Sequence, residues 1–236
     1  MSTIAANLQA VEATIQSAVK AAGRPASSVQ LLAVSKTFPP EAVLEAIACG
    51  QRAFGENYLQ EALDKMRSVA RLAPDIPVEW HFIGPIQSNK TRPIAANFQW
   101  VHTVERLKIA QRLSEQRPPE MGPLNICLQV NISGEATKSG VTPAELPELA
   151  HQVAQLSNLR LRGLMAIPEP ETDVAKQRAA FAQLRALYDS LCGEGLALDT
   201  LSMGMSGDLA AAILEGATIV RIGSAIFGAR QAVVSK

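Results

Sequence analysis

A lysine at the end of an apolar run has the clearest chemical potential in this sequence. Lys36 directly follows residues 32–35, a short run typical of a buried β-strand that opens into a loop. Partial burial lowers the pKa of a lysine and frees its amine to form a Schiff base with an aldehyde. The same position also suits an ordinary solvated lysine just outside a strand, so position alone leaves both interpretations open.

Two turns rich in glycine and serine are suited to binding an anion. One contains Ser206 and Gly207 and precedes an alanine-rich helix, and the other contains Gly223 and Ser224 in the last strand-like run. Free N–H groups and the helix dipole favour an anion where a turn opens a helix. Turns after the last two strands of a β/α barrel commonly bind phosphate. The alternative for the first turn is that Ser206 or Asp208 acts only as a helix N-cap.

Two further polar residues interrupt or end apolar runs. Arg221 lies inside a run where a guanidinium is costly unless it is paired, so it contacts either a ligand or a structural Asp or Glu. Asn57 ends the second run and either orients a ligand ring or caps the following helix. Together with Lys36 and the two turns, they suggest a phosphorylated aldehyde. Pyridoxal 5′-phosphate (PLP) and the sugar-phosphate substrate of a Schiff-base aldolase both fit that description.

A repeating fold has to position these residues. Helical periodicity in the first part of the chain ends at Gly23, and strand-like runs then alternate with helical patterns. The runs cover residues 31–35, 53–57, 79–84, 100–104, 125–131, 161–167, 200–204 and 219–227. This pattern predicts an α/β fold, a single (β/α)8 TIM-type barrel with an extra N-terminal helix and its chemistry at the C-terminal ends of the strands. An open doubly wound sheet is the alternative. No linker-like segment divides the chain, so one domain is expected over residues 1–236.

The composition excludes several classes of protein. Of 236 residues 47% are hydrophobic, and 22 basic residues balance 22 acidic ones, which predicts a sizeable core and no electrostatic footprint for nucleic acid or an anionic membrane. No run of eighteen apolar residues suggests a membrane span, and no signal-peptide pattern is present. The three cysteines are widely spaced and match no zinc motif. A cytoplasmic protein without a metal site is expected.

The candidate residues lie in motifs that resemble the PLP homeostasis protein family, also called the YggS/PROSC family. The matching segments follow one another along the chain at residues 34–37, 54–58, 81–84, 87–90, 130–131, 138–140, 164–167, 201–206 and 220–223. The resemblance implies a barrel like the N-terminal domain of alanine racemase with PLP held covalently. It implies that Lys36 is the Schiff-base lysine, Arg221 the partner of the pyridine nitrogen and Asn57 a residue near the ring. It also implies a phosphate cup made by Ser206, Gly207, Gly223 and Ser224.

The resemblance further implies a role in vitamin B6 and amino-acid homeostasis with little or no catalysis. The expected protein is a cytoplasmic monomer that binds PLP, with PLP-dependent apoenzymes or regulatory proteins as further partners. A PLP-dependent amino-acid racemase or a Schiff-base aldolase is the alternative. A racemase needs an acid or base on each face of the cofactor, and the chain offers only Tyr58 and Tyr188 as tyrosines. Neither is expected opposite Lys36, so no catalytic residue is assigned.

Three other motif positions have two interpretations each. His81 is either a core histidine or a ligand contact. The cluster around Lys90 is either a rim that binds phosphate or a partner, or a solvated charged surface. Residues 135–138, which end in Lys138, form either a lid or a polar loop.

Overall fold

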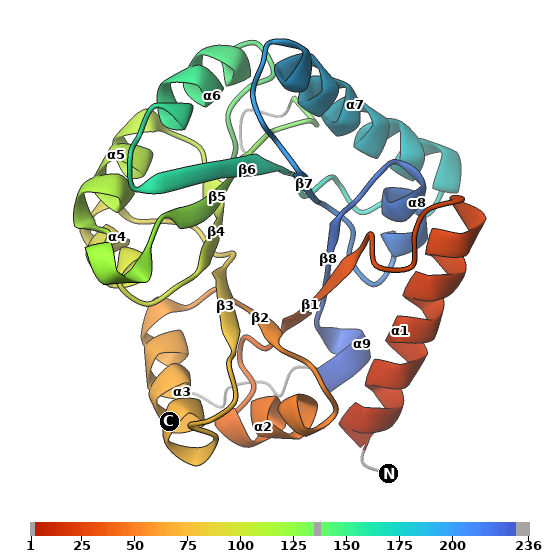
Figure 1. Cartoon of the computed structure of the whole chain (residues 1–236). Coiled ribbons are helices and arrows are strands. Elements are labelled where there is room, and N and C mark those ends of the chain that lie inside the picture. The colour runs from red at the N-terminus through yellow and green to blue at the C-terminus, as the bar shows by residue number, and fades with distance from the viewer. Residues whose placement is uncertain (1–2, 135–137, 230–236) are drawn as a thin grey trace.

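Eight parallel strands close into a barrel in the computed structural model, which describes residues 3–134 and 138–229 (Figure 1). Each strand pairs with its neighbours in sequence, and β8 pairs with β1 to complete the ring. The strands are β1 (Gln30–Val34), β2 (Ala53–Glu56), β3 (Glu79–Phe82), β4 (Trp100–Val104), β5 (Leu124–Gln129), β6 (Leu159–Met165), β7 (Thr200–Ser202) and β8 (Ile219–Ile222). The predicted barrel is confirmed, and the open sheet is excluded.

Helices surround the barrel (Figure 1). They are α1 (Thr3–Ala21), α2 (Pro40–Ala48), α3 (Leu59–Leu72), α4 (Thr91–Ala95), α5 (Leu107–Gln116), α6 (Leu146–Ala154), α7 (Val174–Gly193), α8 (Leu209–Leu214) and α9 (Ser224–Phe227), with short 3-10 turns η1 (Ser88–Lys90) and η2 (Pro119–Met121). The predicted extra N-terminal helix is α1, which packs against α2, α8 and α9. The Asn7 side chain donates a hydrogen bond to the Ile226 carbonyl at 2.8 Å, so α1 supports the turn that follows β8.

The predicted strand over residues 219–227 is wrong in its second half. Strand β8 ends at Ile222, and residues 224–227 form the short helix α9. A short apolar segment is compatible with either structure from sequence. Here the helical turn buries Ile226 while Ser224 stays exposed. Other predicted runs, such as 79–84 and 161–167, also extend past the observed strands into the loops at the C-terminal rim.

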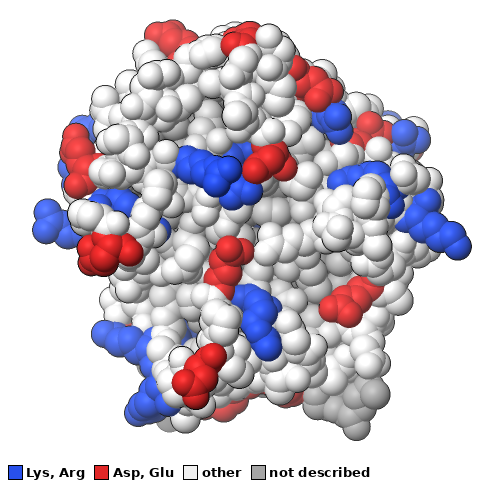
Figure 2. All heavy atoms as spheres, viewed as in Figure 1, with Lys and Arg blue, Asp and Glu red and all other residues white. Residues whose placement is uncertain are grey.

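The surface carries charges of both signs. Figure 2 shows acidic and basic side chains interspersed on one face, in agreement with the equal numbers of each in the sequence. Within residues 3–134 and 138–229, no helix has the length and apolarity needed to cross a membrane. The same residues contain no cluster of His, Cys, Asp and Glu that could hold a metal ion. The single domain over residues 1–236 stays a prediction, because it includes positions outside the described residues.

Candidate functional site

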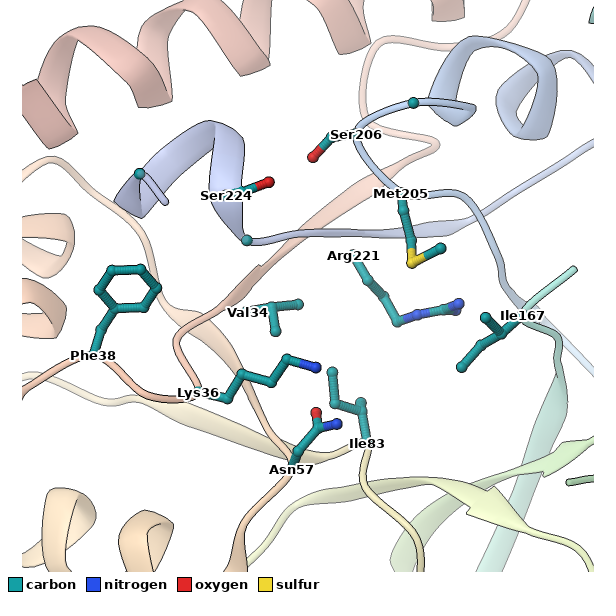
Figure 3. A pocket seen from close by; sticks show the side chains of 13 residues that line it. Val34, Lys36, Phe38, Asn57, Ile83, Ile167, Met205, Ser206, Arg221 and Ser224 are labelled. Atoms are coloured by element: carbon teal, nitrogen blue, oxygen red, sulfur yellow. The ribbon is translucent and has the colours of Figure 1, made fainter. Parts of the chain in front are cut away.

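A cavity of about 290 Å³ lies at the C-terminal ends of β1, β2, β7 and β8 (Figure 3). All seven predicted site residues line it: Lys36, Asn57, Ser206, Gly207, Arg221, Gly223 and Ser224. The apolar part of the wall includes Val34, Phe38, Ile83, Ile167 and Met205. The structure therefore brings together the four strand ends that the sequence placed on one rim.

Lys36 enters the cavity from the turn after β1. Its side chain is half-buried and points toward the middle of the cavity (Figure 3). The next residue, Thr37, has a φ of 68°, a left-handed conformation that a β-branched residue rarely adopts. The Thr37 N–H donates to the Glu61 carboxylate at 2.7 Å, and the Phe38 N–H donates to the Ser35 carbonyl at 3.1 Å. These bonds hold the turn that directs the Lys36 amine inward.

A buried ionic network lies beneath this turn, and the sequence analysis missed it. The Lys65 ammonium group donates to the Ser35 carbonyl at 2.7 Å, to the Glu56 carboxylate at 2.6 Å and to Glu61 at 3.0 Å. The Ser35 hydroxyl donates to the same Glu56 oxygen at 2.6 Å. Burial raises the pKa of Glu56, while the Lys65 charge opposes that rise. The spacing of Ala62, Lys65 and Val69 on the buried face of α3 was the available sequence signal.

Asn57 presents an unsatisfied amide oxygen at the cavity wall. Its Oδ1 atom is buried and has no hydrogen-bond partner among the described residues. The N-cap of α3 is Tyr58, and no side chain caps that helix, so the capping interpretation of Asn57 is wrong. A Cβ on Gly84 would lie 2.2 Å from the Asn57 carbonyl oxygen, so this close approach requires glycine. A buried polar atom without a partner is costly, which makes the amide a suitable contact for a ligand.

The two predicted anion turns lie side by side. Figure 3 shows the Ser206 and Ser224 side chains on the same side of the cavity. Asp208 is the N-cap residue of α8, but its carboxylate accepts from the Met205 N–H at 2.5 Å instead of capping the helix. Ser206 is not the N-cap residue, and α8 has no side-chain cap hydrogen bond, so the interpretation of Ser206 or Asp208 as a side-chain cap is wrong. The first N–H groups of α9 lack intrahelical partners and add donors beside Ser224.

Arg221 is a buried cation without a carboxylate partner. Its side chain is 5% exposed and donates to the Ser202 hydroxyl at 2.8 Å and to the Ala166 carbonyl at 2.9 Å. Within the described part of the chain no Asp or Glu lies at ion-pair distance, so the structural salt bridge is excluded there. Burial lowers the pKa of Arg221 to about 10, and the charge of Asp208 partly opposes that change. The guanidinium is still charged at neutral pH and lines the cavity.

His81 proves to be a core histidine. Its Nδ1 atom lies 2.8 Å from Nε2 of His102, and its Nε2 atom lies 2.8 Å from the Glu79 carboxylate. The Nδ1 atom of His102 lies 2.7 Å from the Ser202 hydroxyl, which also contacts Arg221. Burial lowers the pKa of both histidines, which keeps the two rings neutral near pH 7. His81 does not line the cavity.

Glu79 should give the protein a measurable acid sensitivity. The hydrogen bond from His81 lowers the pKa of Glu79 to about 2, so its stabilising contribution is present above the unfolded-state pKa of about 4.5 and is lost as the pH falls toward 2. Because the side chain is 39% exposed, we expect Glu79→Gln to cost only about 1 kcal/mol at neutral pH. Urea unfolding at about pH 7 and about pH 3 tests this, since the difference from wild type should shrink in acid. A difference that stays constant or grows would contradict it.

Lys90 and Lys138 do not line the cavity. Lys90 is exposed in η1, which agrees with the interpretation of this cluster as a solvated charged surface. Of the predicted lid or loop, residues 135–137 lie outside the described residues, and Lys138 contacts Glu169 at 3.1 Å. Tyr58 is exposed, and the Tyr188 hydroxyl donates to the Leu198 carbonyl at 2.8 Å. Neither tyrosine lines the cavity.

Fold and cavity together define a class of protein: a parallel (β/α)8 barrel whose C-terminal cavity is lined by a lysine, a buried arginine and two turns that contain glycine and serine. The model of the alanine racemase N-terminal domain family matches residues 6–231. The chain therefore belongs to that family and, within it, to the pyridoxal phosphate homeostasis proteins, as the following relatives show.

A pyridoxal phosphate homeostasis protein of Pseudomonas aeruginosa is 66% identical over 230 residues, which cover 98% of this chain and 97% of that one. Another, from Escherichia coli K12, is 53% identical and covers 98% of both chains. The structure of PipY from Synechococcus elongatus, with PLP bound, superposes with a TM-score of 0.83 at 38% identity. The superposition covers 95% of this chain and 100% of the PipY chain. The family resemblance inferred from the motifs is confirmed.

Proposed function

We propose that this protein holds PLP as a Schiff base on Lys36 and takes part in vitamin B6 and amino-acid homeostasis with little or no catalysis. One observation carries the proposal: a lysine amine, an unpaired arginine charge and two hydroxyl-bearing turns line one cavity. The names of the relatives support the homeostatic role, and PipY with PLP bound supports the choice of cofactor.

The residues present fit PLP at both ends of the molecule. Ser206, Gly207, Gly223 and Ser224 would hold the phosphate through hydroxyl and backbone N–H groups. Arg221 would donate to the pyridine nitrogen, and the unsatisfied amide oxygen of Asn57 marks a polar contact near the ring. When bound, PLP supplies an electrophilic aldehyde at the Lys36 amine.

Two features favour a carrier over a racemase or an aldolase. A pyridine nitrogen beside the permanent charge of Arg221 stays unprotonated, which makes the ring a weak electron sink. In addition, neither Tyr58 nor Tyr188 lines the cavity, so no tyrosine among the described residues serves as a second acid or base. Removal of an α-proton from an amino acid should therefore be slow.

Exchange of amino-acid α-protons into deuterated water tests the catalytic part of the proposal. With the protein saturated with PLP, we expect negligible exchange across a panel of amino acids. PLP-loaded Arg221→Glu is the matched comparison, because a carboxylate there raises the pKa of the ring nitrogen and should increase any exchange. Exchange by the wild type at about 1 per second or faster, the rate of ordinary enzymes, would restore the racemase alternative.

The phosphate assignment makes a separate prediction. Ser206→Ala and Ser224→Ala should each weaken PLP binding, because each loses a hydrogen bond to a charged group, worth about 1.5–3 kcal/mol. The double variant should bind more weakly than either single one. PLP titration of the apoproteins measures this, with Ser190→Ala on α7 as a serine control outside the cavity. Wild-type affinity in both single variants would show that these hydroxyls contribute nothing to the site.

The finer assignments of partner and location also remain proposals. PLP-dependent apoenzymes or regulatory proteins are the proposed recipients or sensors of the bound PLP. A cytoplasmic monomer is the proposed state of the protein.

A further inference from the structure

A hydrogen-bond chain crosses the interior of the barrel from its N-terminal end to the cavity. It begins at Glu79, the first residue of β3, and runs through His81, His102 on β4 and Ser202 on β7 to Arg221 on β8. The four contacts span 2.7–2.8 Å. His81, His102 and Ser202 are 0% exposed. The Glu79 side chain is 39% exposed, whereas Arg221 at the other end is 5% exposed at the cavity wall.

The two ends of the chain determine the direction of every hydrogen bond in it. Arginine can only donate, and an ionised carboxylate can only accept. Ser202 therefore accepts from Arg221 and donates its own proton to Nδ1 of His102. His102 must then donate from Nε2 to Nδ1 of His81, and His81 must donate from Nε2 to Glu79. Both neutral rings carry their proton on Nε2.

The opposite direction would leave polar groups unsatisfied at both ends. With the proton of His102 on Nδ1, Ser202 would receive two donors, and its own hydrogen would have no acceptor in the chain. His81 would turn a lone pair toward the Glu79 carboxylate, which is ionised near neutral pH. Unsatisfied polar groups are costly where the side chains are fully buried, so the forward direction is strongly preferred.

We propose that His102 and Ser202 are positioning residues for Arg221, and that Glu79 and His81 select the tautomer that allows this. Ser202 and the Ala166 carbonyl hold two of the guanidinium nitrogens, and the other donors are left for the cavity. The inference rests on the proposed function, because it assigns Arg221 to the pyridine nitrogen of PLP. It adds that a partly exposed carboxylate at the far end of the barrel controls the orientation of that arginine.

Nitrogen-15 spectra of labelled histidine in the apoprotein test the direction of the chain without PLP. The protein has three histidines. The third, His151, is exposed on α6, outside the hydrogen-bond chain, and serves as the reference signal. We expect both buried rings to carry the proton on Nε2. Ser202→Ala should shift the Nδ1 signal of His102, whereas Ser114→Ala, at a buried serine on α5, should leave it in place. A proton on Nδ1 of either buried ring in the wild type would overturn the proposal.

Substitutions at the exposed end test the control by Glu79 with little risk to folding. Glu79→Gln keeps an oxygen acceptor and should preserve both tautomers. Glu79→Lys places a donor opposite Nε2 of His81 and should move the proton of that ring to Nδ1, and the proton of His102 must then move to Nδ1 as well, because two N–H groups cannot face each other at 2.8 Å. Unchanged tautomers in Glu79→Lys would overturn the role of Glu79.

PLP titration then tests the effect on Arg221. Ser202→Ala should bind PLP about tenfold more weakly, equivalent to about 1.4 kcal/mol, with a shifted absorption maximum of the bound cofactor. Ser202→Thr, which keeps the hydroxyl, should restore part of the PLP affinity and should bring the absorption maximum back toward that of the wild type. Wild-type affinity and an unchanged spectrum in Ser202→Ala would overturn the positioning role. If the wild type itself failed to bind PLP, the proposed function would fall, whereas the apoprotein spectra would still decide the direction of the chain.

Discussion

The Lys36→Ala protein should fold normally and lose its covalent attachment to PLP completely. Of the described residues that line the cavity, only Lys36 carries a primary amine, and a Schiff base requires one. The side chain is half-buried at the cavity wall and lies outside the hydrophobic core, so its removal should leave the barrel intact. Weak, non-covalent binding of PLP through the two phosphate turns should remain.

Absorption spectra and borohydride reduction measure this loss. In the wild type, we expect a Schiff-base band that disappears on reduction, and a mass increase on the peptide that contains Lys36. The matched control is Lys90→Ala, which removes an exposed lysine outside the cavity and should behave like the wild type. An unchanged band in Lys36→Ala would place the attachment on another lysine and refute the site assignment.

The Lys65→Met protein should be less stable than the wild type by about 3–5 kcal/mol, since it leaves the buried carboxylate of Glu56 without its partner. Both side chains are almost fully buried, at 2% and 0% exposure, so water cannot take the place of the ammonium group. Removal of Lys65 also raises the pKa of Glu56 further. A carboxyl with a raised pKa destabilises the folded state once it ionises. The loss should therefore be largest at neutral pH and smaller in acid.

Urea unfolding of three variants separates the buried pair from ordinary surface charges. The double variant Glu56→Gln/Lys65→Met should recover much of the loss, because it leaves no unpaired buried charge. Lys176→Met, which breaks an exposed pair with Glu171, should cost less than about 1 kcal/mol. A Lys65→Met protein within about 1 kcal/mol of the wild type would show that the network contributes little to stability.

The sequence by itself determined the barrel and the rim on which the site lies. Eight apolar runs alternating with helical patterns allow few other folds, and parallel strands place all their C-terminal ends on one side. A polar residue directly after an apolar run, as at Lys36 and Asn57, therefore marks the rim from local information alone. For the same reason, the turns at Ser206 and Ser224 could be predicted to lie near each other.

Only the tertiary structure decided which partners the polar residues have. A capping role for Asn57 and a salt bridge for Arg221 were both compatible with the sequence, and the structure excludes both within the described residues. The hydrogen-bond chain that links Glu79 to Arg221 includes a contact between His102 and Ser202, which are 100 residues apart in sequence. Such contacts depend on the register of neighbouring strands and on which side chains turn into the barrel. Both follow from how the closed sheet packs as a whole, and no local pattern carries that information.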